Sequence, residues 1–116
     1  MTYRITEHED YLRAVIADDA STEDFAALYR ELQTRCAHAG YDGALVVVEP
    51  EGALAGPERL VSFRGAGFMA GFRLALVCAT WTLYQACNKA ERAATKAGVN
   101  VRAFLQEMEA VRWLTG

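Results

Sequence analysis

Apolar and polar residues alternate in two short segments near the start of the chain. The first covers residues 3–6, and the second covers residues 11–17, where every second residue from Leu12 to Ile16 is apolar. Alternation with a period of two is typical of a strand that buries one face. The polar residues 7–10 connect the two segments. The pattern therefore predicts a β-hairpin.

The hairpin is followed by a helical pattern. Residues 21–24 read Ser-Thr-Glu-Asp, which is a helix-capping signature. In it a hydroxyl accepts hydrogen bonds from free backbone amides, and acidic groups lie at the positive end of the helix dipole. Gly40 supplies a C-terminal stop. Between these signals the apolar residues recur at spacings of three and four, at Phe25, Leu28, Leu32 and Cys36. This spacing predicts one amphipathic helix.

Two later segments, residues 44–48 and 72–78, are apolar almost without interruption. A strand inside a parallel sheet is covered on both faces and therefore lacks alternation, so both segments are predicted to be buried parallel strands. Pro57 lies between them and suits the first position of a helix, which predicts a helix over residues 57–63. Residues 64–67 then form a flexible connection.

The last third of the chain continues with a helix, a strand and a helix. Thr80 is predicted to cap a helix that runs to Ala97, and Gly98 ends it. Its apolar side is rich in alanine, which implies that this helix approaches the sheet closely. Residues 99–104 are predicted to be a short strand, and residues 106–114 a last helix.

The predicted order is β-β-α-β-α-β-α-β-α within one domain, residues 1–116. Buried strands that alternate with helices favour right-handed crossovers and a parallel sheet. We therefore predict an α/β fold with a mixed, mostly parallel five-stranded sheet and about four helices. The N-terminal hairpin adds the antiparallel pair.

Three stretches resemble a known family when they are combined with this order. Residues 18–25 join the hairpin to a capped helix, and residues 73–77 are followed shortly by Trp81. Near the end, Val-Arg-Ala-Phe at residues 101–104 precedes Glu-Ala-Val-Arg-Trp-Leu at residues 109–114. Together they resemble the STAS domain (sulfate transporter and anti-sigma-factor antagonist), in its SpoIIAA-like branch. The resemblance spans nearly the whole chain, and its motifs concern packing.

The resemblance has two implications for function. Anti-sigma-factor antagonists carry a phosphorylatable serine behind the third strand, but the matching residues 49–56 contain no serine or threonine, and Ser62 comes later, in a predicted helix. The phosphorylation switch is therefore not expected here. The fold of this branch has also been compared with CRAL-TRIO lipid-transfer domains, which implies an apolar ligand.

Composition excludes other classes of function. The net charge is −3 and the twelve lysines and arginines are scattered, so nucleic-acid binding is not expected. The N-terminus lacks the pattern of a signal peptide. The longest apolar run, residues 74–79, is far shorter than the roughly 18 residues of a membrane span. We expect a cytoplasmic protein without a transmembrane segment.

The three cysteines, Cys36, Cys78 and Cys87, lie in apolar stretches without C-x-x-C spacing. We expect buried reduced thiols rather than a metal or redox site. Cys78 is a candidate nucleophile, because it ends a predicted central strand and the next helix N-terminus can lower its thiol pKa. A small cysteine-dependent enzyme that uses Cys78, with Thr80 or Thr82 nearby, is the alternative function.

Two further features carry no chemistry in this interpretation. Gly65, Gly67 and Gly71 do not fit a dinucleotide-binding loop, because the third glycine comes one residue late and the glycines precede a strand rather than a helix. No cofactor is therefore predicted. His8 and His38 have no neighbours at metal-ligand spacing, so we predict surface histidines and no metal site.

The candidate site is the segment around these glycines. Four large apolar side chains lie in it beside two arginines, namely Phe63, Phe68, Met69 and Phe72 with Arg64 and Arg73. They either cover an edge of the core or form a surface for a partner or an acyl chain, with positive charge beside a carboxylate. The main prediction is a non-enzymatic binding or regulatory module. Its candidate partners are an apolar small molecule, another protein or a second copy in a homodimer.

Overall fold

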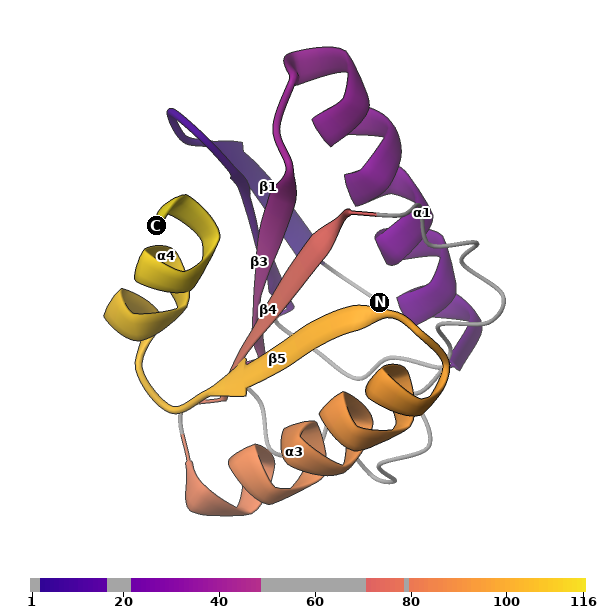
Figure 1. Cartoon of the computed structure of the whole chain (residues 1–116), viewed down its shortest axis with the longest axis vertical. Coiled ribbons are helices and arrows are strands. Elements are labelled where there is room, and N and C mark those ends of the chain that lie inside the picture. Colours follow the sequence, from indigo (N-terminus) through magenta and orange to yellow (C-terminus); the bar gives the residue numbers. More distant parts are fainter. Residues whose placement is uncertain (1–2, 17–21, 49–70, 79) are drawn as a thin grey trace.

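The computed structural model describes residues 3–16, 22–48, 71–78 and 80–116. Five strands form one sheet in the order β1-β2-β3-β4-β5 (Figure 1). β1 runs antiparallel to β2, and the other neighbours are parallel. The strands are β1 (Tyr3–Glu7), β2 (Leu12–Ile16), β3 (Gly43–Val48), β4 (Arg73–Cys78) and β5 (Asn100–Phe104).

Three helices lie in the described residues: α1 (Thr22–Ala39), α3 (Trp81–Lys96) and α4 (Glu107–Thr115). α1 and α3 cover one face of the sheet, and α4 covers the other (Figure 1). The predicted α/β class and the mixed, mostly parallel five-stranded sheet are confirmed, with the order β-β-α-β-β-α-β-α. The helix predicted over residues 57–63 lies outside the described residues.

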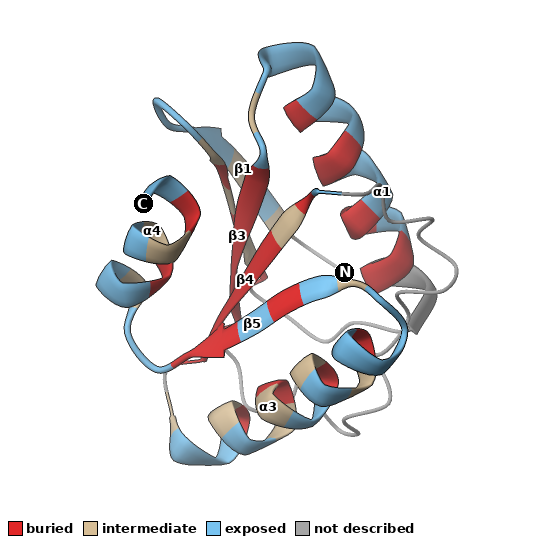
Figure 2. Cartoon of the chain, viewed as in Figure 1, coloured by how far each residue is buried: buried red, intermediate tan, exposed pale blue. Residues whose placement is uncertain are grey.

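The two apolar segments that lack alternation pair as predicted. β3 and β4 are parallel, with Ala44 opposite Leu74 and Val48 opposite Cys78. Every residue of β3 is buried, as are all residues of β4 after Arg73 (Figure 2). The cause is the helix layer on each face, which leaves no side of these strands in water.

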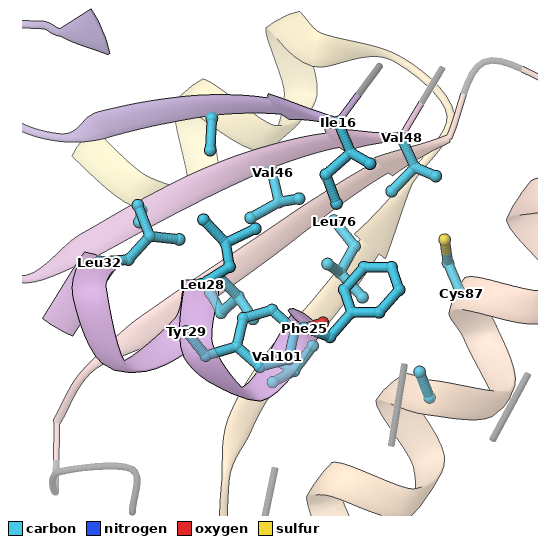
Figure 3. Close-up of a cluster of buried hydrophobic side chains, with 14 of the residues drawn as sticks. Ile16, Phe25, Leu28, Tyr29, Leu32, Val46, Val48, Leu76, Cys87 and Val101 are labelled. Atoms are coloured by element: carbon cyan, nitrogen blue, oxygen red, sulfur yellow. The ribbon is translucent and has the colours of Figure 1, made fainter. Parts of the chain in front are cut away.

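Each face of the sheet has its own core. The larger core packs the apolar stripe of α1 against the strands, with Phe25 and Leu28 facing Val46 and Leu76 (Figure 3). The smaller core lies under α4, where Ala110 and Leu114 pack against β3, β4 and Phe104. Successive residues of a strand point to opposite faces, so β3 contributes to both cores.

α3 lies close to the sheet because its buried side is built from small residues. Cys87, Ala90 and Ala94 are fully buried on that side. The start of the helix is fixed by Thr80, whose hydroxyl accepts a hydrogen bond from the Leu83 amide at 3.2 Å. The predicted cap and the predicted alanine contact are both confirmed.

Candidate functional site

Most of the candidate segment lies outside the described residues, namely Phe63, Arg64, Phe68 and Met69. Phe72 is described and is only 8% exposed, as part of the larger core. Together with Cys36 and Tyr41 it lines a hollow of about 150 Å³. Pockets for small ligands usually measure about 300–1,000 Å³, so this hollow is small for an acyl chain.

Arg73, the other described member of the segment, is engaged inside the molecule. Its guanidinium donates hydrogen bonds to the carbonyl oxygens of Trp113 at 2.9 Å and Leu114 at 3.0 Å. It also lies 5.8 Å from the centre of the Trp113 ring. These carbonyls belong to the last turn of α4, where the helix dipole is negative. Arg73 therefore fastens α4 to the sheet.

The prediction of three reduced thiols was wrong for two of them. Cys78 and Cys87 form a disulfide, whereas Cys36 is free and buried as expected. Cys87 points from α3 toward the sheet (Figure 3), because α3 folds back along the strand that Cys78 ends. Burial raises the pKa of the Cys36 thiol to about 11. In this oxidised state Cys78 is fully buried and carries no thiol that could act as a nucleophile.

The carboxyl ends of the parallel strands lie at one edge of the sheet. α3 begins just beyond the end of β4, and α4 begins just beyond the end of β5 (Figure 1). Open α/β sheets place their ligands at this edge. The two predicted surface histidines lie elsewhere: His8 stacks on Tyr11 beside the hairpin turn, and His38 is exposed in the last turn of α1.

Among the described residues, the exposed large apolar side chains gather at this carboxyl edge. Trp81 is 62% exposed, Leu105 is 41% exposed and Met108 is 66% exposed. Trp81 is the first residue of α3, Leu105 directly follows β5, and Met108 is the second residue of α4. Exposed apolar side chains that form a contiguous patch are candidates for an interaction site.

Tyr84 connects two of these side chains, Trp81 and Leu105, and Met108 follows Leu105 by three residues in the first turn of α4. The Tyr84 ring stacks on Trp81, with 5.6 Å between the ring centres. It also lines a hollow of about 320 Å³ together with Leu105. We refer to Trp81, Tyr84, Leu105 and Met108 as the carboxyl-edge surface.

The hollow within the carboxyl-edge surface has a polar lining of both charges. Its polar side chains are Glu91, Arg102, Gln106 and Glu109. Glu91 accepts a hydrogen bond from the Ala103 amide at 2.7 Å, and Arg102 lies over the Phe104 ring at 5.6 Å. A surface that combines aromatic rings with charges of both signs is better suited to binding another protein than to binding a hydrocarbon chain.

Comparison of the chain with protein families, curated proteins and solved structures found no match. The structure thus shows an α/β fold with a five-stranded mixed sheet, and no family. Within the described ranges, no helix has the length and apolar character needed to cross a membrane.

Sequence analysis did not select the carboxyl-edge surface, although a signal was present. Met108 lies off the apolar side of its helix, which Ala110 and Leu114 define. Trp81 similarly lies off the buried side of α3, which begins at Leu83. A large apolar residue outside the buried stripe of a helix is expected to be exposed.

Proposed function

We propose that this chain is a non-enzymatic binding module that holds a protein partner on the carboxyl-edge surface. The observation that carries the proposal is the location of the exposed Trp81, Leu105 and Met108, which gather at one edge of the described structure. Burying one such side chain is worth about 1.5–3 kcal/mol, so this surface can supply much of the affinity for a partner. Tryptophan and tyrosine are also enriched among residues that dominate binding energy.

A protein partner is favoured over an apolar small molecule. The hollow that Phe72 lines is small, and both hollows beside Tyr84, of about 320 and 640 Å³, are lined by charged side chains. An apolar ligand held by Phe63, Phe68 and Met69 remains a separate proposal, because those residues lie outside the described ranges.

Membership of the STAS superfamily, in its SpoIIAA-like branch, is part of the same proposal. Of the residues that carry the resemblance, 73–77 and 101–104 lie in strands β4 and β5 of the mixed sheet, Trp81 begins α3 and 109–114 lie in α4, whereas residues 18–21 lie outside the described residues. This arrangement is compatible with that fold. A regulatory role through protein contact suits such a module. The absence of serine and threonine from residues 49–56 argues against the phosphorylation switch of anti-sigma-factor antagonists.

Co-purification from the protein's own cells tests the binding function. Trp81→Ser combined with Met108→Ser removes the two most exposed apolar side chains of the surface. We expect at least a tenfold lower recovery of the partner than with the unaltered chain, a loss of about 1.4 kcal/mol or more. The unfolding midpoint should stay nearly constant, because both side chains are mostly exposed in the free chain.

The matched control replaces two exposed residues near the amino ends of the parallel strands, His38→Ser with Lys96→Ser. Both lie at helix ends that precede β3 and β5, away from the carboxyl-edge surface. This control should recover the partner as the unaltered chain does. Equal recovery by the control and by the Trp81 and Met108 variant would refute the proposal.

A further inference from the structure

The two edge strands of the sheet, β1 and β5, differ in whether their outward backbone groups are hydrogen-bonded to other described residues. On β5, the outward amide of Ala103 donates to Glu91 of α3 at 2.7 Å. The next outward amide, that of Val101, donates to the Val99 carbonyl at 3.2 Å. The chain therefore occupies the outward donors of β5 itself, which is a common way to block strand addition at an edge.

At the opposite edge, β1 has no such cover from the described residues. The His8 amide donates a hydrogen bond to the Tyr11 carbonyl at 3.0 Å, so these two residues form one of the hydrogen-bonded pairs of the hairpin. Because these pairs recur every second residue, the backbone groups of Tyr3, Ile5 and Glu7 point away from β2. Within the described part of the chain, these outward groups have no hydrogen-bond partner.

The antiparallel register centred on Ile5 pairs all five residues of β1 with β1 of a second copy. With Ile5 opposite Ile5 of a second copy, Tyr3 lies opposite Glu7 and Arg4 lies opposite Thr6. Each outward amide then faces an outward carbonyl, and no like charges are opposed. Registers centred on Arg4 or on Glu7 would oppose like charges, which is unfavourable.

The helix beside this edge adds complementary charge. The Tyr3 hydroxyl donates to Glu31 of α1 at 3.0 Å, so α1 lies next to β1. Glu31 and Arg35 are both exposed on α1 and 3.8 Å apart. A two-fold axis midway between the two Ile5 residues and perpendicular to the sheet places two antiparallel copies of α1 on the same face, where acidic and basic side chains can alternate.

We propose that a second copy of this chain pairs antiparallel with β1 and joins two five-stranded sheets into one continuous sheet. The contact is isologous, as in most homodimers. It uses the β1 edge and leaves the carboxyl-edge surface beyond β4 and β5 open to a different protein. The dimer therefore does not depend on the proposed binding function.

Sedimentation equilibrium of the purified chain over a range of concentrations tests the dimer. The unaltered chain should approach twice its monomer mass. Ile5→Pro removes the amide at the two-fold axis, and proline is tolerated at an edge where that amide is not used within the fold. We expect its dimer dissociation constant to rise at least tenfold, while Ile5→Val keeps the value of the unaltered chain.

Opposite charges at Thr6 provide a second test that keeps the backbone intact. Thr6→Arg would face Arg4 of the other copy and weaken the dimer, whereas Thr6→Glu would face the same arginine and strengthen it. A monomeric unaltered chain would overturn the proposal. It would also be overturned if the strand that adds to β1 came from a foreign peptide and not from a second copy. Equal dissociation constants for the Thr6→Arg and Thr6→Glu variants would also overturn it.

Discussion

Arg73 joins the first residue of β4 to the last turn of α4 by two hydrogen bonds to main-chain carbonyls. These bonds are charge-assisted, and the carbonyls carry the negative end of the helix dipole. Without the guanidinium, part-buried carbonyls would lose their donors. A single side chain thus fixes the position of the helix that covers one face of the sheet.

We predict that Arg73→Met lowers the free energy of unfolding by about 1.5–3 kcal/mol, as expected for hydrogen bonds that involve a charged group. Methionine keeps much of the apolar stem, so the loss reports on the guanidinium. Urea unfolding measures it. The control is Arg102→Met, because Arg102 is exposed and its described contact is with the Phe104 ring, which is worth at most about 1 kcal/mol. Equal losses would contradict the role of Arg73.

At this scale, the sequence predicts what depends on near neighbours. The Thr80 cap was predictable because its partner, Leu83, lies three residues later. The role of Arg73 was not, because Trp113 lies 40 residues away and no local pattern connects the two. Sequence analysis therefore placed Arg73 beside a candidate ligand, whereas its guanidinium holds a helix.

At the scale of elements, the disulfide fastens α3 to the strand that precedes it. Cys78 ends β4 and Cys87 lies nine residues later, on the buried side of α3. The sequence could not predict this bond, because the spacing matches no redox motif and the contact depends on how α3 folds back. The strands themselves were predictable, since two covered faces leave a continuous apolar run.

We predict that a reducing agent lowers the free energy of unfolding by about 2–3 kcal/mol, the value expected for a cross-link that closes a short loop. Urea unfolding with and without reductant measures the difference. Cys78→Ala with Cys87→Ala should show no response to reductant, whereas Cys36→Ala should respond as the unaltered chain does. Identical midpoints of the unaltered chain in both conditions would contradict the prediction.

Thiol labelling in the same samples tests the alternative function, a cysteine-dependent enzyme that uses Cys78. Without reductant, the unfolded chain should show one free thiol, that of Cys36, because the other two cysteines are bonded. In the folded protein at neutral pH this thiol should react slowly, since burial raises its pKa to about 11. Rapid labelling of Cys78 in the folded protein would favour a cysteine-dependent enzyme over a binding module.

At the scale of the whole molecule, three parts of the sheet have separate roles: the β5 edge, the β1 edge and the carboxyl ends of the strands. α3 closes the β5 edge through Glu91, none of the described residues covers the outward groups of β1, and the carboxyl-edge surface lies beyond β4 and β5. Sequence patterns predicted the sheet, because burial repeats along the chain. They did not predict these surfaces, because Trp81, Leu105 and Met108 come together only when two helices start at the same edge.

Site-specific photo-crosslinking in the protein's own cells tests the central claim most directly. A photoreactive phenylalanine analogue replaces Met108 in one chain and His38 in another, both at exposed positions. The account predicts that the position 108 chain forms an adduct of one defined mass with another protein, and that the position 38 chain does not form it. Absence of any protein adduct at position 108, or the same adduct from both positions, would contradict a binding function at the carboxyl-edge surface.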